Sequence, residues 1–246
     1  ILDGLAPTEF IGYTAMQSEA KVLAIVKNGR RVTAAEQGER VLVVLDKTPF
    51  YAQGGGQVGD SGVLKSENAL LHVSDTTKNQ TGLFLHHACV ARGELCKGDE
   101  VTASVHDSLR RDIMCNHTAA HLLQAALRRV LGTHVEQAGQ MVNDKEVRFD
   151  FTHFSALTPE EIAKVEQEVN REIRMGIPVV CAEMPIEQAK KLGAMALFGE
   201  KYGDVVRVVS MDESIEFCGG THAANTGMIG PFRILSESSV ASGVRR

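Results

Sequence analysis

The chain has 246 residues, enough for one large domain or two ordinary ones with a sizeable hydrophobic core. Hydrophobic residues make up 43% and charged residues 23%, a composition typical of soluble globular proteins. The formal net charge of −5 excludes a general polyanion-binding protein, so any contact with nucleic acid must be local. The sequence has no apolar run of the roughly 20 residues that a membrane helix needs, and no secretory leader is recognisable. We therefore expect a cytoplasmic protein.

The five cysteines are odd in number and widely spaced along the chain. Disulfide frameworks usually show an even number of cysteines at regular spacings. The pattern therefore predicts free thiols.

Short apolar runs dominate the first hundred or so residues. They are separated by Gly, Asp, Asn and Lys, no long helical pattern lies between them, and Asn28-Gly29 is a hairpin-turn signal. The runs cover residues 21–26, 41–45, 69–73, 83–90 and 101–105. Strands at this spacing predict a small β-barrel.

A glycine-rich segment, Gly54-Gly55-Gly56, interrupts this region. Consecutive glycines are costly in backbone entropy, so they indicate positive φ angles or a close approach of the backbone to another group. No Gly-Lys-Ser/Thr follows, which excludes a phosphate-binding P-loop. Two interpretations stay open: an ordinary hairpin or bulge, and a loop that lines a ligand cleft. In the second, Gln57, Asp60 or Ser61 would supply polar contacts.

The composition changes near residue 106, which predicts a domain boundary there. A helix is expected over 108–131, and a second begins at Thr158 with Pro159 and a capping-box Glu161. A short helix is expected over 185–192. Predicted strands cover residues 147–151, 179–181, 205–209 and 232–235. We expect helices packed on one face of a mainly antiparallel sheet.

Two pairs of possible metal ligands stand far apart in the chain. His117 and His121 are four residues apart on the first helix, so both imidazoles project from one face. Cys218 and His222 form the second pair. Together the four side chains suit tetrahedral zinc.

The role of such a metal is open at this point. Thr118 follows His117, so the glutamate of the His-Glu-x-x-His peptidases is missing. Four protein ligands would close a tetrahedral site, whereas hydrolytic zinc keeps one position open. Either His222 stands back, or the ion expands its coordination when substrate binds. A structural zinc, or simply buried histidines, remain alternatives.

Five segments resemble, in the same order, the editing region of alanyl-tRNA synthetases. They are residues 50–62, 116–123, 132–135, 196–202 and 218–222, and the end of the chain, residues 236–239 with 243–246, is also similar. The resemblance covers nearly the whole chain. It implies one zinc ion per chain at His117, His121, Cys218 and His222. It also implies an α+β fold, with a β-barrel over 1–106 and a zinc-containing, two-layer α/β core over 107–246 like that of threonyl-tRNA synthetase.

The implied activity is hydrolysis of tRNA(Ala) wrongly charged with serine or glycine. The parent enzyme of this family attaches alanine to tRNA(Ala) using ATP, but the chain shows no counterpart of the activating domain. Expected partners are tRNA(Ala) and the other synthetase domains, with no membrane and no DNA. A zinc-stabilised tRNA-binding module without catalysis and a general metallohydrolase are the alternative functions.

Specificity for serine over alanine requires polar groups that form hydrogen bonds with the seryl hydroxyl. Ser61 stands where the family often has threonine, and Gln137 is a second candidate. Ala120 and Gln124 depart from the threonine and histidine that are frequent in the family. Residues named from sequence position alone are Glu216 and Asp144 as general bases, and Lys201, Arg245 and Arg246 as phosphate contacts.

Overall fold

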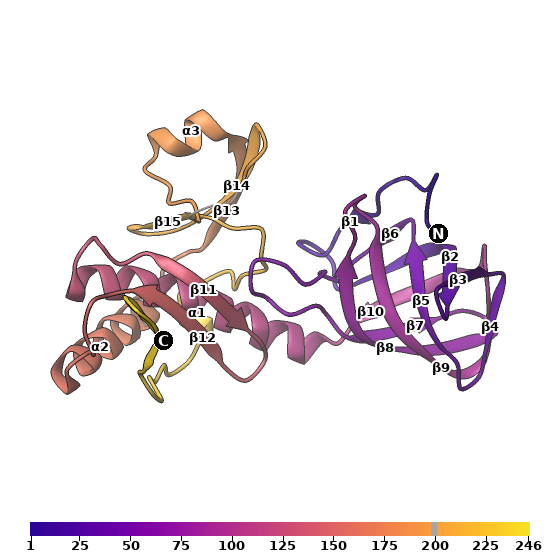
Figure 1. Ribbon diagram of the computed structural model, residues 1–246. Coiled ribbons are helices and arrows are strands. Elements are labelled where there is room, and N and C mark those ends of the chain that lie inside the picture. The colour runs from indigo at the N-terminus through magenta and orange to yellow at the C-terminus, as the bar shows by residue number, and fades with distance from the viewer. Residues whose placement is uncertain (198–200) are drawn as a thin grey trace. The chain divides into compact units, whose positions relative to one another are not determined.

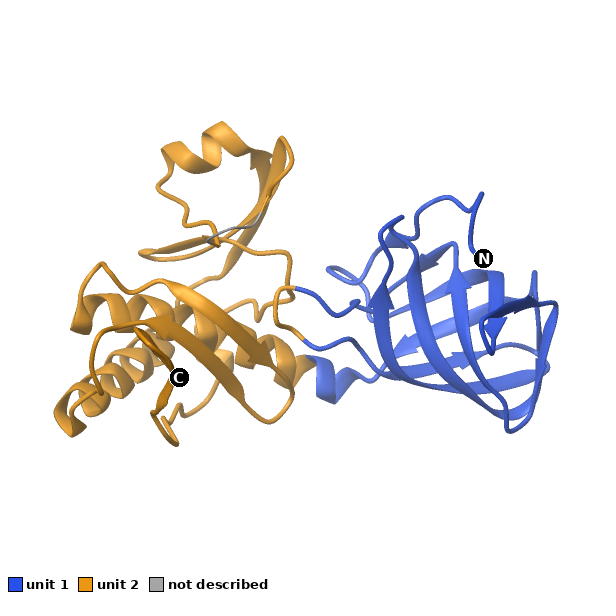
Figure 2. Ribbon diagram, in the orientation of Figure 1, with its two compact units in different colours: residues 1–54, 58–110 blue, residues 55–57, 111–246 orange. Residues whose placement is uncertain are grey.

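A computed structural model describes residues 1–197 and 201–246 and divides into two compact units. Unit 1 holds residues 1–54 and 58–110, and unit 2 holds residues 55–57 and 111–246 (Figure 2). Residues 198–200, in the middle of the predicted 196–202 motif, lie outside the described residues. The expected order, a barrel followed by an α/β core, is confirmed.

Unit 1 is a closed antiparallel barrel (Figure 1). Each strand pairs with the next, and β10 pairs back onto β2 to close the sheet. In spatial order the strands are β2 (Gln17–Lys27), β5 (Arg40–Leu45), β9 (Phe84–Cys96), β8 (Ala69–Lys78), β7 (Gly62–Lys65) and β10 (Glu100–Val105). The four-residue strand β7 was not predicted, because it directly follows the glycine-rich segment and shows no clear alternation of apolar and polar residues.

Short strands complete unit 1. β3 (Arg30–Val32) forms a hairpin with β2, and its turn is the predicted Asn28-Gly29, with φ angles of 49° and 72°. These positive angles are those that a tight hairpin turn requires. β4 (Ala34–Glu36) pairs with β9, and β1 (Glu9–Phe10) pairs in parallel with β6 (Lys47–Thr48).

The barrel is filled by alternate side chains of its strands. Fully buried aliphatic residues include Ile25, Leu45, Leu64, Leu71 and Leu95. Each such side chain contributes about 1.5–3 kcal/mol to the free energy of unfolding. The sequence pattern of short apolar strands thus builds one continuous core.

A buried ion pair anchors the end of the glycine-rich loop within unit 1. Both Arg110 and Asp60 have side chains only 1% exposed, and Arg110 Nε donates to Asp60 Oδ2 over 2.9 Å. The guanidinium also donates to the carbonyls of Gly12 and Pro49 over 2.8 and 2.7 Å. Asp60 therefore serves the barrel.

Unit 2 contains two antiparallel sheets and the helices packed with them (Figure 1). The four-stranded sheet runs β11 (Gln137–Val142), β12 (Val147–Thr152), β17 (Val244–Arg245), β16 (Ser239–Ala241). The three-stranded sheet runs β13 (Val180–Pro185), β14 (Val205–Met211), β15 (Ser214–Phe217). The helices are α1 (Asp107–Leu131), which begins in unit 1, α2 (Pro159–Met175), α3 (Ile186–Lys191) and the 3₁₀ turn η1 (Thr226–Met228).

Helix α2 begins and ends where its sequence predicts. The Thr158 hydroxyl accepts from Glu161 N, and the Glu161 carboxylate accepts from Thr158 N. Gly176 ends the helix in the left-handed conformation, with φ 62°. The buried face of α2 joins α1, β12 and β14 in one core, whose members include Leu122, Leu127, Phe149, Phe151, Val165, Val169 and Val209.

Two expectations for this half were wrong. The sheet is divided into two, and residues 232–235 do not form a strand. The backbone amides of this segment are bonded to α2 instead: Phe232 N donates to Asn170 Oδ1 and Ile234 N to Glu166 Oε2, over 2.8 and 2.9 Å. Two polar side chains of the helix thus replace a strand partner.

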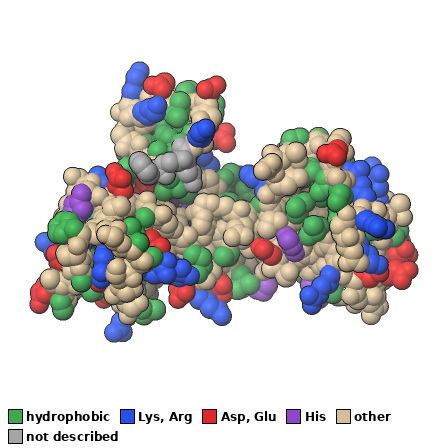
Figure 3. All heavy atoms as spheres, viewed as in Figure 1, with side chains coloured by type: hydrophobic (Ala, Val, Ile, Leu, Met, Phe, Trp, Pro, Cys, Tyr) green, Lys and Arg blue, Asp and Glu red, His purple; other side chains and the backbone are tan. Residues whose placement is uncertain are grey.

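The described surface carries both signs of charge. On the face shown in Figure 3, Lys and Arg side chains are interspersed with Asp and Glu. Among the described residues, no helix has the length and apolar character required to cross a membrane.

Replacing Arg110 by leucine should lower the free energy of unfolding by about 3–5 kcal/mol, because Asp60 would stay buried without its counterion. Urea unfolding of the full chain measures the change. The exposed Arg92, substituted in the same way, is the control and should shift stability by less than about 0.5 kcal/mol. Equal effects of the two substitutions would contradict a structural role for the pair.

Candidate metal centre

Helix α1 presents two buried imidazoles on one face. His117 is 1% and His121 5% exposed, and their rings stack with centroids 5.5 Å apart and planes inclined by 16°. Residues four apart on a helix lie one turn apart, so the sequence spacing alone sets this arrangement. The helix thus supplies a preformed pair of possible nitrogen ligands.

The loop after β15 brings the second pair against the first. Cys218 Sγ lies 3.5 Å from His117 Nε2 and 3.2 Å from His222 Nε2. Possible ligand atoms of His117, His121, Cys218 and His222 all lie within 4.8 Å of one another. The structure therefore brings the four sequence-predicted ligands together in a cluster that could hold one metal ion.

Arg207 on β14 shapes this loop. Its guanidinium NH1 donates to the carbonyls of Cys218 and Gly220 over 3.1 and 2.6 Å. The Cys218 amide donates in turn to the Arg207 carbonyl over 3.0 Å. The loop is thereby held in the conformation that directs Sγ toward α1.

A glutamine from the glycine-rich segment fixes the orientation of His117. Gln57 is fully buried, its Nε2 donates to Thr221 Oγ1 over 2.8 Å, and its Oε1 accepts from Thr221 N over 2.9 Å. The backbone donor dictates which amide atom is the oxygen, so His117 Nδ1, 2.7 Å from Oε1, must carry a proton. The lone pair of His117 Nε2 is then available to a metal.

Thr118 fixes His222 in the same way. Its hydroxyl donates to the Met114 carbonyl over 2.9 Å and accepts from Ala223 N over 3.0 Å. Since its proton is used, Oγ1 can only accept from His222 Nδ1, 3.2 Å away. The residue that replaces the peptidase glutamate therefore positions a ligand.

Glu216 orients the remaining imidazole. His121 Nδ1 donates to Glu216 Oε2 over 2.8 Å, and among the described residues His121 Nε2 is buried without a partner. A buried polar atom without a partner is costly unless a ligand satisfies it. In all three histidines Nδ1 faces a partner that can accept its proton, which is the usual arrangement around metal-bound imidazoles. The residues present fit a metal.

The charges of the cluster agree with this fit. Burial raises the pKa of the Cys218 thiol, but the nearby His117, His222 and His121 outweigh it and hold that pKa well below its usual range. Burial lowers the pKa of His222 to about 3. For His121, burial opposes protonation, yet Glu216 and Cys218 raise the pKa well above its usual value. A cation binding here must displace the His121 proton, so binding is coupled to proton release.

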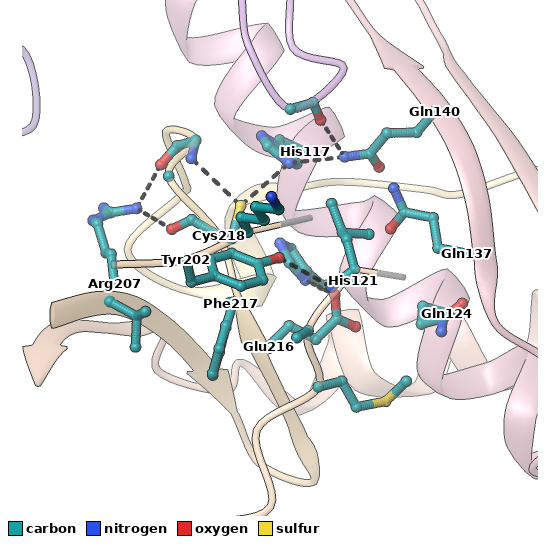
Figure 4. Close-up of a pocket in the computed structure, with 18 of the residues that line it drawn as sticks. His117, His121, Gln124, Gln137, Gln140, Tyr202, Arg207, Glu216, Phe217 and Cys218 are labelled. Carbon is teal, nitrogen blue, oxygen red and sulfur yellow. Dashed lines mark hydrogen bonds and ion pairs between the residues drawn. The ribbon is translucent and has the colours of Figure 1, made fainter. Parts of the chain in front are cut away.

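The cluster borders a cavity of about 490 Å³ within unit 2. Figure 4 shows His117, His121 and Cys218 near the amide side chains of Gln124, Gln137 and Gln140, which come from α1 and β11. Apolar and aromatic residues form another part of the wall: Met195, Leu197, Tyr202, Val205, Val206 and Phe217. The pocket thus combines ligand atoms, neutral amides and apolar surface.

The described end of the 196–202 motif helps to build this wall. The Tyr202 hydroxyl accepts from Leu197 N over 3.0 Å, and its ring packs edge-on against Phe217 with centroids 4.9 Å apart. Lys201 also lines the cavity.

The glycine-rich segment divides between two tasks. Gly55 lines the cavity, and Gly56, with φ +85°, would place a Cβ 2.5 Å from the Gln140 carbonyl oxygen. Only glycine permits this close approach. Gln57 orients His117 as described, whereas Asp60 binds Arg110 inside unit 1.

Four more residues were predicted from the sequence to act on the substrate. Gln137 begins β11 and lines the cavity, while Ser61 belongs to unit 1, where its carbonyl accepts from His106 N. Their proposed contacts with substrate stay predictions. Glu216 lines the cavity next to His121, and Asp144 lies in the β11–β12 turn.

The two terminal arginines already have acidic partners. Arg245 is paired with Glu237, and Arg246 with Asp150 over 2.7 Å. A phosphate contact by either would have to compete with these carboxylates.

The roles of Arg207 and Gln140 were not predicted from the sequence. A charged residue among the four valines that begin β14 was the available signal for Arg207. Gln140 has no such signal, because its importance comes from contact with Gly55, whose carbonyl accepts from Gln140 Nε2 over 2.8 Å.

Comparison with known proteins places the chain in a family. A profile described as tRNA synthetases class II (A) matches residues 2–109, and one described as the threonyl and alanyl tRNA synthetase second additional domain matches residues 206–246. Curated relatives match along nearly the whole chain. The chain belongs to the alanyl-tRNA synthetase family.

Three relatives named alanine--tRNA ligase illustrate the match. The protein from Bacillus velezensis is 49% identical over 99% of the chain, that from Acetivibrio thermocellus 53% over 100%, and that from Pseudomonas syringae pv. tomato 53% over 97%. The chain spans 28% of the length of each alanine--tRNA ligase.

Replacing Gly220 by alanine should reduce metal affinity by about 10–100-fold, the usual cost of disturbing a ligand's surroundings. The added Cβ would lie 2.1 Å from His117 Cε1 and 2.9 Å from Gln57 Oε1, so the imidazole must move. Titration with Co²⁺, followed by its absorption spectrum, measures the affinity. Gly203 lines the same cavity with nothing within 4 Å of an added Cβ, so Gly203→Ala is the control and should bind normally.

Proposed function

We propose that this chain is an editing unit that hydrolyses the ester of tRNA(Ala) mischarged with serine or glycine, and that its metal is zinc. The observation that carries the proposal is the His₃Cys cluster, of which His117, His121 and Cys218 line a cavity bordered by Gly55 of the glycine-rich segment. Membership of the alanyl-tRNA synthetase family supplies the substrate class. The cytoplasm, where tRNA is charged, is the proposed location.

A hydrolytic site, separate from the pocket that selects the amino acid, is needed because selection by that pocket has a physical limit. A pocket that admits alanine cannot exclude the smaller glycine, and it rejects serine, one hydroxyl larger, by only about 100-fold. Hydrolysis after charging removes the errors. The site must then spare alanine, which requires contacts that alanine cannot make.

The ligand set suits zinc in particular. Three imidazole nitrogens and one thiolate form the tetrahedral environment that zinc prefers. Bound by His117, His121, Cys218 and His222, zinc would supply Lewis-acid polarisation, either of a water or of the aminoacyl group. We propose this role for the metal on the strength of the ligand set and the adjoining cavity.

The side chains of the protein would hold the reacting ester and its protons. Glu216 keeps the proton on His121 Nδ1, so that Nε2 is the nitrogen that would give up its proton to a metal. The apolar wall around Tyr202 and Phe217 excludes water from the remainder of the aminoacyl group. Lys201, which lines the cavity, is our candidate for a contact with a phosphate of the tRNA end.

Replacing Cys218 by alanine should reduce the rate of deacylation of serine-charged tRNA(Ala) by at least about 100-fold, because changes around a ligand already cost 10–100-fold. Release of labelled serine measures the rate. Cys181→Ala is the control, since Cys181 is exposed and outside the ligand set. We expect this variant to retain wild-type activity.

The same assay separates the alternatives. Tested with alanine-, serine- and glycine-charged tRNA(Ala), an editing unit hydrolyses the last two and spares the first. A binding module without catalysis would retain tRNA but leave every ester intact. A general metallohydrolase would also cleave esters unrelated to tRNA. Equal rates for the wild type and Cys218→Ala would remove the metal from the mechanism.

A further inference from the structure

We propose that Gln124 is a specificity-determining residue that contacts the side-chain hydroxyl of a seryl group in the cavity. This inference rests on the proposed function and names a contact that distinguishes serine from alanine. The supporting observations are the position of the residue on α1, the unpaired state of its amide oxygen and the charges around it.

Helix α1 places Gln124 beside the metal cluster. It follows His121 by three residues, so the two side chains project from one face with Cβ atoms about 5–6 Å apart. Gln124 is 3% exposed and lines the 490 Å³ cavity together with His121 (Figure 4). A second, smaller cavity of about 190 Å³ also borders Gln124.

The amide of Gln124 is incompletely used inside the protein. Its Oε1 is buried and has no hydrogen-bond partner among the described residues. By contrast, Gln57 uses both ends of its amide on Thr221 and His117, and Gln140 donates to the Gly55 carbonyl. Because an unpaired buried oxygen is destabilising, its presence beside the cavity indicates a partner from outside the chain.

The neutral amide matches a hydroxyl better than the other groups of an aminoacyl ester. The α-ammonium of the substrate is charged, and the carboxylates of Glu136 and Glu216 line the same cavity as stronger partners for it. A hydroxyl both donates and accepts, so it can pair with either atom of the Gln124 amide. An alanyl methyl would leave the amide unpaired, which penalises the correctly charged tRNA.

The test replaces Gln124 by methionine, which keeps the length of the side chain and removes its polar atoms. We expect kcat/KM for serine-charged tRNA(Ala) to fall by about 10–100-fold, the value of one buried hydrogen bond. The value for glycine-charged tRNA(Ala) should stay within about threefold of wild type, because glycine has no hydroxyl to lose. Gln167→Met, an exposed glutamine on α2, is the matched control and should change neither.

A binding measurement supports the rate assay without depending on turnover. The probes are the seryl and alanyl amides of 3′-amino-3′-deoxyadenosine, titrated by calorimetry against the metal-loaded protein. The wild type should prefer the seryl amide by about tenfold or more, and Gln124→Met should show no preference. Gln124→His retains a planar donor and acceptor and should keep the preference for the seryl amide. If it does, the loss of preference in Gln124→Met is due to the lost polar atoms and not to poor folding.

The outcomes separate this inference from the proposed function. If the wild type hydrolyses neither mischarged tRNA, the proposed function fails. If it hydrolyses both, and Gln124→Met loses both activities equally or neither, the assignment of Gln124 is overturned while the editing function stands. A loss confined to the seryl substrate, together with loss of the seryl preference in binding, establishes the contact.

Discussion

The convergence of four candidate ligand atoms from two distant segments is the feature around which unit 2 is arranged. Helix α1 supplies His117 and His121, and the loop after β15 supplies Cys218 and His222. Because Nδ1 of each imidazole is engaged by Gln57, Glu216 or Thr118, Nε2 is the nitrogen whose lone pair can bind a metal. A ligand set held in this way would reorganise little if a metal bound, which favours a high affinity.

The glycine-rich segment serves both units with different residues. Gly56 passes within reach of the Gln140 backbone where no side chain fits, and this lets Gln57 enter the core of unit 2 next to His117. A few residues later, Asp60 is tied to Arg110 in unit 1. Backbone freedom and two buried polar anchors are thus combined in one short stretch. Gly56 in this segment is explained by a specific steric limit, because a Cβ there would clash with the Gln140 backbone.

The cavity beside the cluster has walls of contrasting chemistry. Neutral amides of Gln124, Gln137 and Gln140 stand near the ligands, whereas Tyr202 and Phe217 contribute an apolar surface. Such a mixture suits a small substrate end that carries an ester, an ammonium and a short side chain. In the proposed editing reaction, selection among serine, glycine and alanine would depend on which polar groups of the substrate find partners, since these side chains differ little in volume.

The sequence by itself determined the local elements and the four candidate metal ligands. Hydrophobic periodicity, the capping residues of α2 and the four-residue spacing of His117 and His121 are properties of neighbouring residues, and a family resemblance linked them to Cys218 and His222. Only the tertiary structure decided the rest. The tautomers depend on contacts such as that of Gln57 with Thr221, 164 residues apart, and residues 232–235 lie against α2 because Asn170 and Glu166 bond their amides. Contacts between distant residues leave no periodic signal in a single sequence.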